Sequence, residues 1–329
     1  MNRAAETSQP AVSGAVALKF AGQTGEYFRI WIVNICLTVV TLGIYSAWAK
    51  VRRKRYFYGC TLLEGSAFEY TGNPVTILKG RLIVFAAFIA FSLLSEIHPA
   101  VQLVLFITFL GFLPWAILRA LQFNARNSIH RNVRFGFNST KREVGVLLLI
   151  PIFLVPLTLG LAYPYYLHRK RRFFLEHSTY GRTAFGFTAS ARDYYYAALK
   201  LSLAFVGFLI GSIATLGIGL IPLYVLLRAY AEATFADVAW RNTTLGDIRF
   251  ACSWKAGELF VLYFVNALAV LVSVGLLVPW AAIRTARYKL ERIVLQSEHG
   301  LGGFLTATQE NVGAVGDEAG ELLGFDFGL

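Results

Sequence analysis

The sequence has little charge and few of the residues that build catalytic or metal sites. Charged residues occupy 15% of its 329 positions, well below the roughly 25% usual for soluble domains. Five scattered histidines and three cysteines, Cys36, Cys60 and Cys252, form no C-x-x-C, H-E-x-x-H, G-x-S-x-G or P-loop pattern. His98 beside Glu96 is more typical of a solvated loop than of a metal site. We therefore expect reduced thiols, no metal, no cofactor and no enzymatic activity.

Apolar sequence, in contrast, is abundant. Hydrophobic residues make up 56% of the chain, and the mean hydropathy is +0.55. Several uncharged runs reach the ~20 residues that span hydrocarbon. They cover 30–49, 82–95, 99–118, 144–167, 201–227 and 259–283. The first residues lack the apolar stretch of a cleavable signal peptide, so we expect membrane insertion to begin after Glu26.

The net charge of +12 raises the question of nucleic-acid binding, and the placement of the cations argues against it. Of 31 Lys and Arg residues, 28 fall in segments between the apolar runs. The other three are Arg3, Lys19 and Arg29. Such clusters beside membrane spans are typical of cytoplasmic loops. No zinc-finger spacing or RNA-binding aromatic motif accompanies them. We expect anionic lipid headgroups at the cytoplasmic face, and no nucleic acid, as partners of these cations.

One pattern recurs along the chain after the apolar runs: an aromatic residue, often preceded by Pro, and then an arginine four positions later. The aromatic residues are Trp48, Trp115, Tyr165, Tyr224 and Trp280, and the arginines are Arg52, Arg119, Arg169, Arg228 and Arg284. We interpret the aromatic residues as interfacial anchors. The arginines are candidates for a pore mouth or for lipid-phosphate binding, with simple headgroup anchoring as the plainer alternative.

Aromatic pairs and acids extend this pattern. Phe68 with Tyr70, Phe135 with Phe137 and Phe185 with Phe187 form F-x-[F/Y] pairs after turn-like residues, which predicts short β-hairpins. Acids precede the apolar runs, where helix starts favour negative charge. These acids are Glu26, Glu143, Asp193 and Glu258.

Together these features predict a mainly α, multi-pass integral membrane protein of five repeated helical-hairpin units, each followed by a short cytoplasmic β-hairpin. The units start near residues 20, 68, 135, 185 and 250. We expect a flexible N-terminus over 1–19, one membrane domain over 20–304 and an acidic flexible tail over 305–329.

Charge placement favours hairpins over single crossings, because hairpins put every basic segment on one side of the membrane. The turns are expected at 41–43, 95–100, 158–160, 215–219 and 273–275. Two arms sharing 24 residues give only about 18 Å each, short of the ~30 Å hydrocarbon core. The short pairs would therefore extend into polar flanks or stop partway as re-entrant pairs. Single crossings, which give two inverted halves, are the alternative.

Three stretches of the sequence resemble a known family. "FAGQTGEYFRIWIVN", "TLGIYSAWAKVRRKRYFYG" and "FEYTGNPVTILKGRLI" are similar to the YjgN-like family of bacterial inner-membrane proteins, a domain of unknown function. The resemblance covers roughly 20–304. It implies a location in the bacterial inner membrane and carries over no catalytic residue.

Two functions remain open from the sequence. In the first, a transporter- or channel-like protein moves a small solute or lipid. In the second, a non-catalytic membrane scaffold binds a protein partner through its cytoplasmic β-hairpins, and homo-oligomers are possible. Ionisable residues are nearly absent from the apolar runs, which counts against a proton-coupled pump. A continuous polar cavity would favour transport, whereas a solid apolar interior would favour the scaffold.

Overall fold

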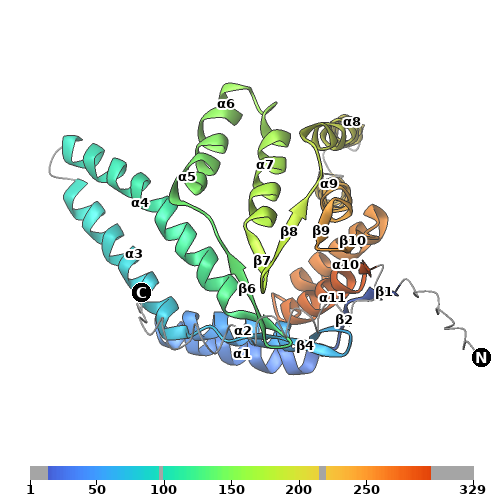
Figure 1. Ribbon diagram of the computed structural model, residues 1–329, viewed down its shortest axis with the longest axis horizontal. Helices are drawn as coiled ribbons and strands as arrows, with labels where there is room; N and C mark the ends of the chain where they lie inside the picture. The colour runs from blue at the N-terminus through green and yellow to red at the C-terminus, as the bar shows by residue number, and fades with distance from the viewer. Residues whose placement is uncertain (1–13, 96–98, 215–219, 298–329) are drawn as a thin grey trace, which may run out of the picture.

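A computed structural model describes residues 14–95, 99–214 and 220–297. Within these residues helices come in successive pairs, and Figure 1 shows the pairs spread around the strands. The helices are α1 Thr24–Val40, α2 Ser46–Gly59, α3 Pro74–Ser95, α4 Pro99–Arg126, α5 Lys141–Leu149, the π-helical turn η1 Ile150–Leu154, α6 Val155–Leu157, α7 Tyr163–Glu176, α8 Ala191–Ala214, α9 Leu220–Arg241, α10 Ala256–Val272 and α11 Val278–Glu291.

The strands form one antiparallel sheet of eleven, in the order β1-β11-β10-β9-β8-β7-β6-β5-β4-β3-β2. They are β1 Gly14–Ala17, β2 Lys19–Phe20, β3 Thr61–Leu63, β4 Ser66–Tyr70, β5 Ser128–His130, β6 Val133–Phe137, β7 Ser178–Tyr180, β8 Thr183–Phe187, β9 Thr243–Leu245, β10 Ile248–Cys252 and β11 Ile293–Ser297. Only Leu18 separates β1 from β2, so both ends of the order belong to one extended segment. The sheet therefore closes into a barrel-like ring.

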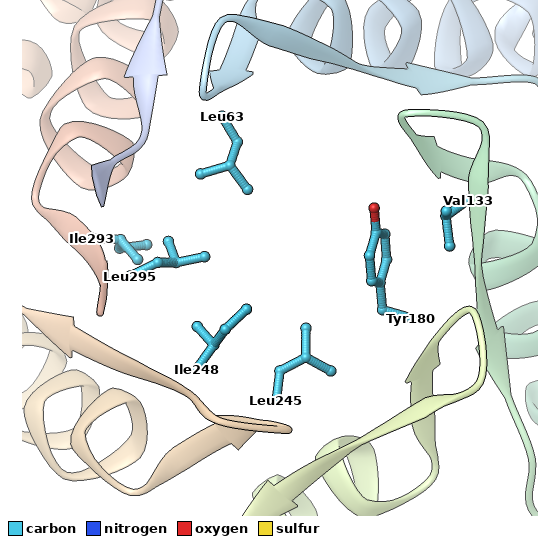
Figure 2. Packing of buried hydrophobic residues seen from close by; sticks show 7 residues of the cluster. All are labelled: Leu63, Val133, Tyr180, Leu245, Ile248, Ile293 and Leu295. Atoms are coloured by element: carbon cyan, nitrogen blue, oxygen red, sulfur yellow. The ribbon is translucent and has the colours of Figure 1, made fainter. Parts of the chain in front are cut away.

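Alternate residues of every strand face the centre of this ring. Figure 2 shows seven of them pointing inward: Leu63, Val133, Tyr180, Leu245, Ile248, Ile293 and Leu295. Phe68, Phe135, Phe185 and Phe250 pack against this cluster. The second aromatic residue of each pair lies two positions further along the same face. Phe137 packs against α7 through Phe173, at a ring distance of 5.8 Å. The F-x-[F/Y] pairs thus fill the ring and fasten it to the helices.

Two-residue turns close the β-hairpins. Glu64 and Gly65 have φ of 49° and 77°, and Arg131 and Asn132 have φ of 48° and 63°. Positive φ at both central residues is the type I′ turn, whose twist matches that of the flanking strands. Arg131 and Glu64 also form an ion pair of 3.3 Å between the two turns.

Each helix pair leaves the sheet and returns to it, because a strand lies immediately before and after it in the chain. The basic segments at the ends of α2, α4, α7, α9 and α11 consequently lie on the sheet side of the helices. In the described part of the chain, three helices are long and apolar enough to cross a membrane: 74–93 of α3, 100–126 of α4, and α8. Helix α10 is apolar but shorter.

The predicted fold class is wrong. A mainly α protein of five repeated helical hairpins, each with its own β-hairpin, does not describe a closed sheet of eleven strands. Moreover, three described helices rather than ten have the length and composition of spans. Alternation in a sequence shows where a strand lies but not its partner. The pairing of Phe68 with His130 and of Phe135 with Tyr180 joins distant hairpins.

The structure describes only part of the flanking segments. The first strand begins at Gly14, within the segment 1–19 that was predicted to be flexible. The tail 305–329, the turn at 215–219, the centre 96–98 of the turn at 95–100, and His98 with Glu96 lie outside the described residues.

Candidate functional site

An open cavity of about 560 Å³ lies where the ring meets the ends of α2, α4 and α11. We call it the ring-mouth cavity. The ring contributes Phe68 and Phe135 to its wall, and the helices contribute Phe57, Ala125 and Leu290. The wall is therefore mainly aromatic and aliphatic, which is the usual lining of a small-molecule site.

One small side chain of the cavity wall has a large counterpart elsewhere in the ring. Ala125 of α4 lies three positions before β5, and Trp240 of α9 lies three positions before β9. Trp240 packs into the ring beside Phe250, at a ring distance of 5.8 Å. Ala125 fills no comparable volume and instead lines the cavity. The ring is thus packed on the α9 side and open on the α4 side.

Hydroxyl groups supply the polar part of the cavity wall. Ser128 and Ser178 donate to the carbonyls of Asn124 and Phe174, at 2.9 and 2.6 Å. Because the Ser128 proton is used there, Tyr58 Oη donates to Ser128 Oγ, at 3.1 Å. The serine oxygens keep lone pairs for a ligand. The cavity therefore suits an amphipathic molecule with a hydrogen-bond donor.

A cation lies beside this wall. Lys54 Nζ donates to Asn124 Oδ1 at 2.6 Å and lies 4.5 Å from the centre of the Tyr70 ring. Burial, together with the charges of Lys50 and Arg53, holds the pKa of Lys54 below its usual value. An anionic head group at the cavity edge would relieve both the burial cost and the repulsion.

The five predicted arginines lie on five different helices around the ring and do not build one site. Arg52, Arg119, Arg169 and Arg228 are exposed, and Arg284 is partly buried. Arg228 lies 5.6 Å from the Tyr263 ring. Arg284 lies 5.2 Å from the Trp280 ring and donates to Asn266 Oδ1 at 3.5 Å.

Arg284 belongs to a groove of about 600 Å³ between α10 and α11. Arg287 and Arg292 also line it, as do Glu258 and Glu291. Arg292 is already paired with Glu258 at 2.7 Å, and Arg287 donates to the Gly22 carbonyl at 2.9 Å. Among the described residues no carboxylate pairs with Arg284 or Arg287, so these two charges are the ones an external anion would meet in the groove.

The predicted anchors and acids occupy defined positions. Trp48 stacks on Tyr45 at 6.1 Å, and Trp115 contacts Phe112 at 4.9 Å. Tyr165 is partly buried and Tyr224 is exposed. The acids Glu26, Glu143, Asp193 and Glu258 lie in the first turns of α1, α5, α8 and α10. Glu143 forms a capping box with Thr140, whose backbone N–H, followed by the Ser139 hydroxyl, lowers the Glu143 pKa to about 2.

Sequence reasoning missed one ionic cluster. Glu232 of α9 pairs with Lys289 of α11 and accepts a 2.5 Å hydrogen bond from Tyr263 of α10. Lys289 also lies 5.4 Å from the Trp254 ring. A signal was available, because the residue four after the recurring arginine is aromatic in four cases and Glu232 in the fifth. The cluster ties three helices together. No group of three or more His, Cys, Asp or Glu residues in the described chain could hold a metal ion.

Apolar helices of spanning length and cationic helix ends are typical of a membrane protein, and here they surround a ring of strands. The chain belongs to a family described as bacterial protein of unknown function (DUF898), whose model matches residues 15–322. This agrees with the resemblance seen in the sequence.

Curated relatives include the inner membrane protein YjgN of Salmonella typhimurium, 33% identical over 146 residues, which are 42% of this chain and 37% of the relative. YjgN of Escherichia coli K12 is 34% identical over 125 residues, 37% of this chain and 31% of the relative. The chain thus spans about a third of the length of the curated relatives it matches. These names support a location in the bacterial inner membrane. No solved structure matches the chain.

Proposed function

We propose that the protein binds a small amphipathic solute or lipid in the ring-mouth cavity, as a transporter- or channel-like protein of the inner membrane. The cavity itself is the observation that carries this proposal. Its aromatic wall, free hydroxyl lone pairs and adjacent Lys54 fit an apolar body with a polar or anionic head. The exposed arginines around the ring are proposed to contact anionic headgroups at the cytoplasmic face.

Photo-crosslinking tests this proposal. The protein is placed in bilayer nanodiscs with a diazirine-bearing fatty acid, irradiated and mapped by mass spectrometry. We expect adducts on the cavity residues Phe57, Tyr58 and Phe135. Ala125→Trp fills the cavity, and we expect it to reduce these adducts about tenfold, equivalent to ~1.4 kcal/mol of binding free energy. Adducts on Phe85, which is 61% exposed on α3, report general contact with lipid and should not change.

Ala120→Trp is the matched control, because Ala120 is exposed on the same helix and does not line the cavity. Its cavity residues should carry the same amount of adduct as those of the unmodified protein. Equal labelling of the cavity residues in the Ala125→Trp and Ala120→Trp proteins, or labelling of Phe85 alone, would contradict the proposal.

One observation favours the second function, a membrane scaffold that binds a protein partner. The centre of the ring is packed with apolar side chains. A closed ring joined to every helix pair is a rigid platform. An unlabelled cavity in the crosslinking experiment would favour this role.

A further inference from the structure

Among the turns that the structure describes, three that join the helices of a pair have the same form. The turns join α1 to α2, α6 to α7, and α10 to α11. Each has Thr or Ser, then an aliphatic residue with left-handed φ, then Gly. Leu42, Leu159 and Val274 have φ of 49°, 50° and 51°, and the glycines that follow have φ of 92°, 90° and 90°. Two successive left-handed residues reverse the chain tightly, and the second must be Gly to avoid a steric cost.

The tips of these turns are apolar and uncovered. Leu42 and Leu159 are each 94% exposed, and Val274 is 92% exposed. Turns in water favour Gly, Asn, Asp, Ser and Pro. In a water-exposed turn, an aliphatic residue with left-handed φ is unfavourable for two reasons: its backbone is strained, and its apolar side chain is exposed to water. The same tip in hydrocarbon gains from its apolar side chain.

Every backbone N–H of the turns is paired within the turn. In the first turn the donors run from Thr41 to Ser46, and the acceptors are carbonyls at positions 37–39, 41 and 43 together with the Thr41 hydroxyl. The hydroxyl accepts from Tyr45 N–H at 2.9 Å. In the other two turns, the hydroxyls of Thr158 and Ser273 accept from the backbone N–H groups of Ala162 and Leu277, at 3.0 Å each. None of these N–H groups needs water as a partner. Backbone in hydrocarbon must be hydrogen-bonded within the protein in this way.

The charges lie too close to the tips for a full crossing. Leu42 follows Arg29 by thirteen residues and precedes Lys50 by eight, and Val274 precedes Arg284 by ten. At ~1.5 Å per residue these arms reach about 12–20 Å beyond their cations, roughly half of a ~30 Å hydrocarbon core. In α4, by contrast, twenty residues separate Pro99 from Arg119, or about 30 Å.

We infer that these three helix pairs are re-entrant: they enter the bilayer from the leaflet beside the sheet, and their tips contact acyl chains without reaching the opposite surface. The longer pairs α3–α4 and α8–α9 hold the candidate spans. The bilayer would thus be crossed by two pairs and supported from one side by three.

Spin-label accessibility measures the depth of the tips. Leu42, Leu159 and Val274 are changed one at a time to Cys in a chain whose Cys36, Cys60 and Cys252 are replaced by Ala, labelled with a nitroxide and placed in liposomes. Collisions with oxygen report hydrocarbon, and collisions with a nickel chelate report water. We expect high oxygen and low nickel accessibility at all three tips. Arg182, exposed in the β7–β8 turn, is the control and should show the reverse.

High nickel accessibility at any tip would place that tip in water and overturn the inference for that pair. Low accessibility to both reagents would indicate protein cover, as in contact with a second copy, and would also overturn it. Hydrogen exchange of the unmodified protein in nanodiscs provides a second measurement. Amides 41–46 should exchange far more slowly than those of the Arg182 turn, and equally fast exchange would contradict the inference.

Discussion

At the residue scale, His130 is a buried titratable group of the ring. It is 1% exposed and stacks on Phe68 at 4.4 Å. Tyr180 Oη donates to the His130 carbonyl at 3.1 Å, so Nδ1–H of His130 donates to Tyr180 Oη at 3.3 Å. Its Nε2 makes no hydrogen bond of regular geometry, and the nearby backbone carbonyls of Leu63 and Ser66 only partly oppose the lowering of the pKa. Burial and the Arg131 charge lower the pKa of His130, and burial raises the pKa of Tyr180 to about 12.

This pKa shift predicts that acid weakens the ring. A folded pKa below the unfolded value of 6.5 means that the unfolded chain takes up the proton first. The stabilisation is complete above pH 6.5 and is lost as the pH falls from 6.5 through the folded pKa. Thermal unfolding in detergent at pH 7.5 and 5 should show a lower midpoint at pH 5. His130→Phe keeps the stacked ring and should reduce this difference.

Asn132→Gly supplies the control for that measurement, because it changes the same turn at a position with φ of 63° and removes no titratable group. Its pH dependence should equal that of the unmodified protein. If His130→Phe also kept the full difference between the two pH values, His130 would not be its source.

At the element scale, the short segment 14–20 closes the ring. Val16 and Leu18 pack against the ring cluster, and Phe20 packs between α1 and α11. Leu18 N–H donates to the Ile293 carbonyl at 3.2 Å. Leu18→Pro removes this donor at the joint of β1 and β2. We expect a loss of about 1–3 kcal/mol of unfolding free energy, the usual cost of an unsatisfied buried group. Leu18→Val keeps the N–H and the inward side chain, and it should lose less.

Denaturant titration of the two variants compares these effects. Equal stability of Leu18→Pro and Leu18→Val would mean that the hydrogen bond to Ile293 does not hold the ring closed.

Local elements were readable from the sequence, whereas their assembly was not. The F-x-[F/Y] pairs lie on β4, β6 and β8, and Glu143 begins α5, because alternation and helix-start charge act over a few residues. Segment 14–20 is short and follows a polar terminus. Its alternation is therefore too brief to distinguish a strand from a loop. The ring-mouth cavity is lined by residues as distant in the sequence as Leu18, Ala125 and Leu290, and no short-range pattern indicates that they meet.

At the scale of the whole molecule, the ring determines which side the cations occupy. Because each helix pair starts and ends at one sheet, the basic ends of α2 and α7 must face the same compartment whether a pair crosses the bilayer or stops within it. Charge alone allowed an arrangement in two inverted halves, since six and seven cations flank the run 144–167. A single closed sheet cannot lie on both sides of a membrane.

Labelling from each side tests this arrangement and its orientation. Arg53 and Lys170 are exposed on α2 and α7, and each is changed to Cys in the chain that lacks native cysteines. A membrane-impermeant maleimide should label both in inside-out vesicles and neither in right-side-out vesicles, because Lys and Arg near spans stay cytoplasmic. Labelling of both only from outside would reverse the orientation but keep the ring. Labelling from opposite sides would be incompatible with a ring that joins all the helix pairs, since β2 to β4 and β7 would then lie across the bilayer from each other.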